Sequence, residues 1–221
     1  MASLSRPGAI LLDLDGTLVD TVGTRIEAWL RTFAEFEIPA DREQVAALIG
    51  SDGKHLAREV SGSAGRPVDD ELAEQIDKRS GEIYSELNTD PRRLPGVGAF
   101  LDAVEAQGIP WSIATSSRRE QTGRSVAALG RATEPRMVDG SSVERAKPAP
   151  DLMLAAAREL AVPPDQCWCV GDSTWDMRAA AAAGMTPVAV LAGSAIAPHD
   201  LREAGAVACV AQLDNLIPAL S

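Results

Sequence analysis

Six short apolar segments constrain the fold of this chain more than any other feature of its sequence. Most of them are apolar throughout rather than at alternate positions, which is typical of strands buried on both faces of a parallel sheet. Helical patterns lie between most of them. The expected strands span residues 9–14, 110–116, 136–138, 167–171, 187–191 and 206–210. Strands that alternate with helices predict an α/β fold with a doubly wound, mainly parallel sheet.

The interval 21–90 interrupts this alternation, because it contains helical patterns and no convincing strand. Apolar residues at helical spacing predict one amphipathic helix and then four more. They are Ile26, Trp29, Leu30 and Phe33 for the first helix, then Val45 with Leu48 and Ile49, Leu56 with Val60, Leu72 with Ile76, and Ile83 with Leu87. The segment 60–70 is expected to be a flexible connection. We therefore expect an all-helical insertion between the first and second strands.

The composition limits the classes of partner. A formal charge of −11 argues against a nucleic-acid or anionic-membrane surface, since both need clustered Lys and Arg. No stretch approaches the roughly 20 apolar residues of a membrane span, and residues 1–8 lack the apolar run of a targeting signal. The 45% hydrophobic content is sufficient for a buried core. We expect a cytoplasmic protein that binds neither nucleic acid nor membranes.

The three cysteines fit a reducing compartment better than a disulfide framework. Cys167 and Cys169 occupy alternate positions of one expected strand and so point the same way. A metal-binding pair is conceivable. Burial as small hydrophobic residues is the favoured interpretation, because free cysteines commonly have that role.

Polar residues follow the first expected strand. Ligands of open parallel sheets bind outside the carboxyl ends of the strands. Asp13 and Asp15, at positions i and i+2, face the same side, and two carboxylates held together share either a proton or a cation. Asp and Gly are also ordinary turn residues. The full string DLDGTLVD at 13–20 favours a functional site over a simple turn.

Other polar residues follow or flank the later strands. Thr115 ends an apolar run, and a hydroxyl with the following N–H groups can cradle a phosphate, although such residues are also common caps. Lys147 stands before two prolines and a helix. It could neutralise phosphate as a point cation, whereas taken alone it would be read as a solvated surface residue. Asp172 follows an apolar strand, and Asp176 lies one helical turn further on. Carboxylate oxygens such as these are ligands that Mg²⁺ prefers.

The chain resembles the haloacid dehalogenase-like (HAD) hydrolases of the phosphatase type, in which a helical cap is inserted after the first strand. The strings DLDGTLVD, IATSS, KPAPD and GDSTWDM occur in the order of that family, and the resemblance covers nearly the whole chain. It implies that the first, second and fourth strands are neighbours. It also implies a catalytic core at 1–18 and 94–221 and a cap domain at 19–93.

The resemblance assigns chemistry to the core residues. Asp13 would be the nucleophile that forms an aspartyl-phosphate, and Asp15 the general acid that later acts as base. Asp13, Asp172 and the backbone carbonyl of Asp15 would hold Mg²⁺. Asp176 would orient a bound water or Lys147.

The remaining core residues would bind the phosphate group: Thr115, the N–H of Ser116, and Lys147 would hold its three equatorial oxygens. Dehalogenases of this fold lack an acid two residues after the nucleophile, so the presence of Asp15 disfavours dehalogenation. Sugar-phosphate mutases retain both aspartates and stay open as an alternative.

Cap residues are expected to select the substrate. Arg25 lies on the first expected helix, and Lys54 and His55 lie in 48–56, which resembles the substrate-specificity loop of the family. Plain solvent exposure is the alternative for Lys54 and His55. The leading hypothesis is a Mg²⁺-dependent phosphatase for a small phosphorylated metabolite, such as phosphoglycolate or a sugar phosphate. A mutase resembling β-phosphoglucomutase is second, and a non-catalytic phosphate-binding protein is third. The sequence does not indicate an oligomeric state.

Overall fold

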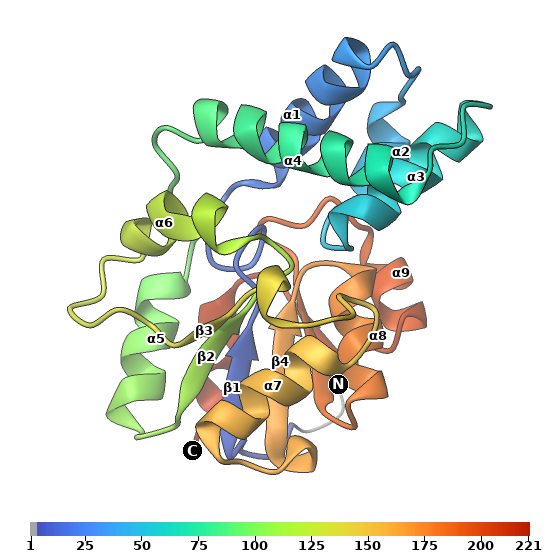
Figure 1. Ribbon diagram of the computed structural model, residues 1–221. Coiled ribbons are helices and arrows are strands. Elements are labelled where there is room, and N and C mark those ends of the chain that lie inside the picture. Colours follow the sequence, from blue (N-terminus) through green and yellow to red (C-terminus); the bar gives the residue numbers. More distant parts are fainter. Residues whose placement is uncertain (1–3) are drawn as a thin grey trace.

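The computed structural model describes residues 4–221 and contains a sheet of six parallel strands (Figure 1). The spatial order is β3-β2-β1-β4-β5-β6. The strands are β1 (Ala9–Leu12), β2 (Trp111–Ala114), β3 (Met137–Val138), β4 (Cys167–Gly171), β5 (Thr186–Val190) and β6 (Ala208–Val210). The expected parallel α/β fold is confirmed, and each strand lies within two residues of its predicted bounds.

The continuously apolar strands are buried on both faces, as their pattern predicts. Ile10 and Leu12 of β1 join an apolar cluster with α5 (Val97–Ala106) and the short 3-10 helix Leu213–Ala219. Leu11, between them, faces the opposite cluster with α7 (Asp151–Leu160) and α8 (Thr174–Ala182). Helices therefore cover both faces of the sheet. Further α-helices of this part of the chain are α6 (Arg119–Ala128) and α9 (Pro198–Glu203).

Strand β1 lies between β2 and β4, so that the three carboxyl ends meet at one edge. Leu12 is in register with Ile113 on one side and with Val170 on the other. The residues that follow these strands, which include Asp13, Thr115 and Asp172, are thereby brought to the same place. From β1 the chain adds β2 and β3 on one side of β1, and it then crosses to add β4 on the other side. The carboxyl end of β1 is therefore the switch point of the sheet, where ligands bind in such folds.

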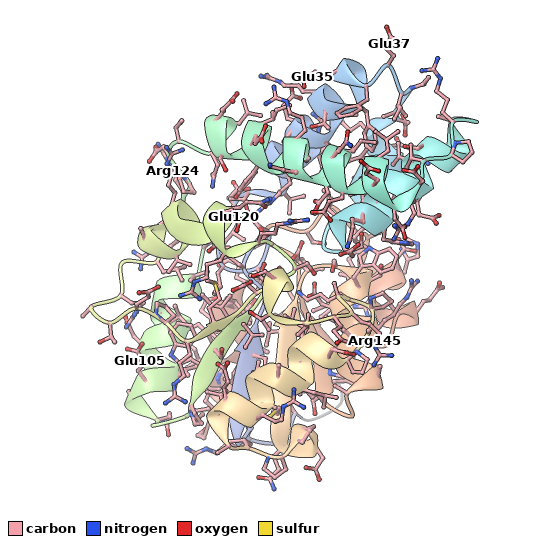
Figure 2. The ribbon with its side chains drawn as sticks, in the orientation of Figure 1. Glu35, Glu37, Glu105, Glu120, Arg124 and Arg145 are labelled. Atoms are coloured by element: carbon pink, nitrogen blue, oxygen red, sulfur yellow. The ribbon has the colours of Figure 1, made fainter. Side chains whose placement is uncertain are left out.

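Four helices form a separate layer above this edge of the sheet (Figure 1). They are α1 (Val22–Glu35), α2 (Arg42–Leu48), α3 (Gly53–Ser63) and α4 (Asp70–Leu87). The layer has its own apolar cluster, in which Trp29 stacks on Phe33. Contacts with α6 join the layer to the rest of the chain: Arg124, labelled in Figure 2, donates to the backbone oxygens of Ser85 and Asn88. Among the described helices, none is both long and apolar enough to cross a membrane.

Two details of the helical layer differ from the sequence prediction. The two short helices expected around Leu72 and Leu87 are one continuous helix, α4. Their apolar pattern is interrupted by Ser80 and Gly81, small residues buried on the inner side of α4, where a Cβ at Gly81 would meet Gln121 of α6. The expected connection at 60–70 is shorter than predicted, because α3 continues to Ser63.

A tight turn carries the chain away from the end of β1. Gly16 has φ 81°, and its N–H donates to the carbonyl of Val19 at 2.8 Å. A Cβ at Gly16 would lie 2.3 Å from a carboxylate oxygen of Asp172 and 2.6 Å from a methyl group of Val22. The absence of a side chain here therefore permits both the left-handed backbone and the close approach of the loop after β4.

Replacing Gly16 with alanine is expected to destabilise the fold more than the same change at Gly108. Both glycines have positive φ, but a Cβ at Gly108 meets nothing within 4 Å. Gly108→Ala should therefore cost about 1–2 kcal/mol of left-handed strain. Gly16→Ala should cost roughly 2–5 kcal/mol, because overpacking adds to that strain. Urea unfolding of both variants measures the difference, and equal losses would contradict the close packing at Gly16.

Candidate active site

Lys147 is a buried cation at the carboxyl edge of the sheet. Its side chain is fully covered, and its Nζ lies 2.6 Å from Asp13 Oδ1 and 2.7 Å from Asp176 Oδ1. It also donates to the carbonyl of Ala114 at the end of β2. The local sequence alone favoured a solvated position for Lys147, and that interpretation is wrong. Two hydrogen bonds and one further ion pair therefore hold the ammonium group in place.

Asp13, Asp172 and Asp176 form a buried carboxylate cluster. One oxygen from each of the three lies within 4.8 Å of the others. Neighbouring hydroxyl groups orient two of them. Thr17 Oγ1 donates to Asp172 Oδ1 at 3.0 Å, and the N–H and hydroxyl of Ser173 donate to Asp176 Oδ2 as part of the cap of α8. The cluster is thus built from the turn after β1, the loop after β4 and the first turn of α8.

This cluster has a deficit of positive charge. Burial raises the pKa of Asp13 to about 7, because the loss of hydration outweighs the attraction of Lys147. Burial, with Asp176 and Asp13 nearby, raises the pKa of Asp172 well above its usual value. In the described part of the chain, Lys147 is the cationic side chain paired with the cluster. The donor set consists of oxygens, and the charge deficit favours a cation, so these residues fit a hard divalent metal ion.

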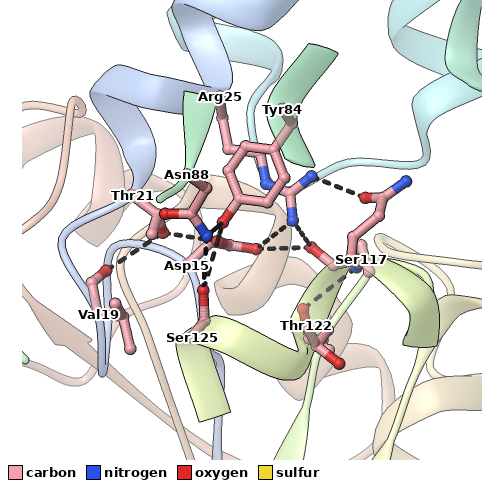
Figure 3. A network of polar contacts seen from close by, with 12 residues as sticks. Asp15, Val19, Thr21, Arg25, Tyr84, Asn88, Ser117, Thr122 and Ser125 are labelled. Atoms are coloured by element: carbon pink, nitrogen blue, oxygen red, sulfur yellow. Dashed lines mark hydrogen bonds and ion pairs between the residues drawn. The ribbon is translucent and has the colours of Figure 1, made fainter. Parts of the chain in front are cut away.

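Asp15 is not part of this cluster and accepts four hydrogen bonds of its own (Figure 3). Thr21 and Tyr84 donate to Oδ1 at 2.5 and 3.1 Å. Arg25 and Ser117 donate to Oδ2 at 3.0 and 2.6 Å. Burial alone would raise the pKa of Asp15, but the Arg25 charge and these hydrogen bonds outweigh it and lower the pKa. The structure therefore holds Asp15 as a carboxylate.

Two of the three candidate phosphate-binding residues, Thr115 and Ser116, directly follow β2. The N–H of Thr115 is used by the sheet, since it donates to the carbonyl of Val138 at 3.1 Å. Its Oγ1 accepts from the N–H of Ser117. The hydroxyl of Ser116 donates to the carbonyl of Gly50 in the helical layer at 2.9 Å. Both residues line the same cleft as Asp13, and their contact with phosphate stays a prediction.

A cleft of about 290 Å³ separates the helical layer from the carboxyl edge of the sheet. Its wall includes Asp13, Asp15 and Thr115 from below and Arg25 and Lys54 from above. This volume is near the lower end of the roughly 300–1,000 Å³ found for ligand pockets, so the cleft suits a small molecule.

The structure separates the three residues expected to select the substrate. Arg25 bonds directly to Asp15, and its guanidinium lies 3.4 Å from the centroid of the Tyr84 ring. Lys54 is half-exposed and lies 3.5 Å from Glu74 of α4. His55 packs edge-on against Trp175 of α8.

Sequence analysis missed several residues of this site. Tyr84 is separated from Asp15 by 69 positions and Ser117 by 102, so neither contact has a local signal. Arg118 joins the two layers through ion pairs with Glu74 and Asp77 of α4, at 2.7 and 2.6 Å. Its place directly after the IATSS string was the one available indication that it lies at the cleft.

Comparison with known proteins places this geometry in a family. The family model described as haloacid dehalogenase-like hydrolase matches residues 10–190. The phosphoglycolate phosphatase of Cupriavidus necator is 34% identical and aligns with 100% of this chain and 96% of its own length. The β-phosphoglucomutase of Bacillus subtilis is 28% identical, with 87% of each chain aligned.

A solved structure supports the same assignment. The crystal structure of a hydrolase from Pseudomonas syringae superposes with a TM-score of 0.90 and 30% sequence identity, covering 96% of this chain and 97% of that one. The family model spans most of the chain, from β1 to the last residue of β5. The expected order of motifs is thus carried on the expected fold, and the chain belongs to the haloacid dehalogenase-like hydrolases.

Proposed function

We propose that this protein is a Mg²⁺-dependent phosphatase that hydrolyses a small phosphorylated metabolite through an aspartyl-phosphate intermediate. The observation that carries the proposal is the position of Asp13, which contacts buried Lys147 and lies beside Asp172 at the floor of the cleft. We also propose a cytoplasmic location, a catalytic core at 1–18 and 94–221, and a cap at 19–93. Similarity to phosphoglycolate phosphatases supports the substrate class.

In the first step an Asp13 oxygen forms a bond to phosphorus, and the bond from phosphorus to the ester oxygen breaks. The contacts in the structure hold Asp15 as a carboxylate, so it has to take up a proton from solvent before this step, and it then gives that proton to the leaving oxygen. In the second step Asp15 takes a proton from water as the water oxygen bonds to phosphorus, and the bond from phosphorus to Asp13 breaks. Free phosphate leaves, and Asp13 is regenerated.

Other residues of the chain hold the reacting groups. Lys147 fixes Asp13 and supplies positive charge to the phosphate, and Thr115 and the N–H of Ser116 complete the phosphate contacts. Asp176 orients Lys147. Asp13, Asp172 and the carbonyl of Asp15 would hold Mg²⁺, which supplies further charge stabilisation when bound. Phosphoryl transfer depends mostly on position and charge, so this set is sufficient.

A mutase is the second candidate, and the similarity to the Bacillus subtilis β-phosphoglucomutase favours it. Mutases and phosphatases share the two-step chemistry and differ in what accepts the phosphoryl group, a sugar hydroxyl or water. Incubation with sugar phosphates separates them, since a mutase would form the isomeric sugar phosphate faster than free phosphate.

Asp13→Asn is expected to abolish turnover without loss of the fold. The amide is nearly the same size but lacks the anionic oxygen that attacks phosphorus. Phosphate release from p-nitrophenyl phosphate and from a panel of phosphorylated metabolites measures the effect, and circular dichroism checks the fold. Turnover equal to that of the wild type would refute the nucleophilic role.

Mg²⁺ is expected to raise the unfolding temperature of the protein, because it relieves the charge deficit of the buried cluster. Asp172→Asn should remove most of this shift. Asp139→Asn is the matched control, since Asp139 is also a buried carboxylate near the end of a strand but caps Ser141 instead. The control should keep the Mg²⁺-dependent shift. A shift of equal size in both variants would place the ion elsewhere.

Lys147→Ala is expected to slow the reaction by roughly 2–4 kcal/mol in the activation barrier, by analogy with lost oxyanion donors. It removes the cation that fixes Asp13 and neutralises phosphate. Lys78→Ala is the control, because Lys78 lies exposed on the outer side of α4. Measurement of kcat for both variants at saturating Mg²⁺ tests this role. A loss of less than about tenfold, or 1.4 kcal/mol, would mean that Lys147 is dispensable for catalysis.

A further inference from the structure

The carboxylate of Asp15 has its acceptor positions filled. An ionised carboxylate offers about four such positions, and Thr21, Tyr84, Arg25 and Ser117 occupy them (Figure 3). The proposed mechanism needs Asp15 to contact first the leaving oxygen and then a water. Neither finds an open position on this carboxylate until one of the four donors withdraws.

Arg25 is the donor that a substrate can remove. Thr21 is fully buried at the start of α1, and Tyr84 is held by Asn88 as well as by Asp15. Arg25 is the charged member of the four, has a long side chain and lines the cleft. Its two terminal nitrogens bond to Asp15, Ser117 and Gln121. An anionic group in the cleft would bind the charged guanidinium of Arg25 far more strongly than it would bind the neutral hydroxyl group of any of the other three donors.

The other cationic side chains that line the cleft already have anionic partners. Arg118 is paired with both Glu74 and Asp77, and Lys54 is paired with Glu74. A substrate anion near these two cations would also meet the two carboxylates. Arg25, by contrast, is paired with Asp15, the carboxylate that has to be released for the reaction.

We propose that Arg25 is a specificity-determining residue that exchanges Asp15 for an anionic group of the substrate. The anionic group takes the guanidinium, and Oδ2 of Asp15 becomes available to the leaving oxygen. This inference rests on the proposed phosphatase function. It narrows the substrate class to small phosphomonoesters whose alcohol part carries a carboxylate or a second phosphate close to the ester oxygen.

The test compares three two-carbon esters on the wild type and Arg25→Met. They are 2-phosphoglycolate, with a carboxylate tail; ethylene glycol bisphosphate, with a phosphate tail; and 2-hydroxyethyl phosphate, with a neutral tail. The wild type should favour an anionic tail by about 10- to 100-fold in kcat/KM, the size expected for hydrogen bonds to a charged group. The two anionic esters show which tail the residue prefers.

Arg25→Met should lose this preference in a specific way. The kcat/KM for the two anionic esters should fall. The kcat for the neutral ester should stay the same or rise, because Oδ2 of Asp15 is then available without an anionic tail to displace Arg25. If Arg25 had a purely structural role, the substitution would instead lower kcat/KM for the anionic and the neutral esters by the same factor. Arg25→Lys should keep part of the preference, since the charge remains and the planar fork is lost. If Arg25→Met does not fold, Arg25→Gln serves in its place.

Arg118→Met is the matched control, because Arg118 also joins the two layers at the cleft. It should leave the ratio between anionic and neutral esters unchanged. The inference is overturned if the wild type shows no preference for an anionic tail, or if Arg25→Met lowers all esters equally. Absence of phosphate release from every ester would instead refute the proposed function, so the two failures are distinguishable.

Discussion

The burial of three carboxylates around one ammonium group is the constraint on which the rest of this structure depends. Asp13, Asp172 and Asp176 lose their hydration, and Lys147 compensates only part of the cost. Such an arrangement is unfavourable for folding by itself, so it indicates a site selected for chemistry. The whole chain has a net charge of −11 and the cluster itself is net negative, so a cation held by these carboxylates would supply the positive charge that an anionic substrate needs.

The topology of the sheet makes this concentration of charge achievable. β1 lies in the centre, and its register with β2 and β4 aligns the ends of all three strands. Asp13 continues the ladder of β1, since its N–H still donates to the carbonyl of Val170. Lys147 arrives from the segment before α7, a helix that packs on the same sheet. Asp13, Asp172 and Asp176 are therefore held at the ends of regular elements, and Lys147 is held by its contacts with Asp13, Asp176 and the end of β2, which limits reorganisation during the reaction.

The sequence predicts the strands that carry the site better than it predicts the contacts between the side chains of the site. Continuous apolar runs located the strands, and Asp13 and Asp172 follow from their position at strand ends. Burial of Lys147 could not be derived locally, because its neighbours in the sequence also fit a surface turn. Only the order of motifs in the resemblance pointed to it.

The helical layer shows a second limit of sequence analysis. The split prediction for α4 failed because its inner side carries two small buried residues, Ser80 and Gly81, and a pattern of apolar residues does not reveal small buried ones. Gly81 lies against Gln121 of α6, where a larger side chain would not fit. The contacts of Tyr84 and Ser117 with Asp15 join distant parts of the chain. Only the folded chain brings them together.

The environment of Asp15 links its chemistry to the position of the helical layer. Arg25 and Tyr84 come from α1 and α4, whereas Ser117 comes from the loop after β2. The chain passes between the two layers in two neighbouring segments, and the N–H of Asp20 in one of them donates to the carbonyl of Arg92 in the other. Any movement that lifts α1 and α4 from this loop removes two donors from Asp15 at once. The position of the helical layer and the availability of the Asp15 carboxylate are therefore coupled, because Arg25 and Tyr84 contribute to both.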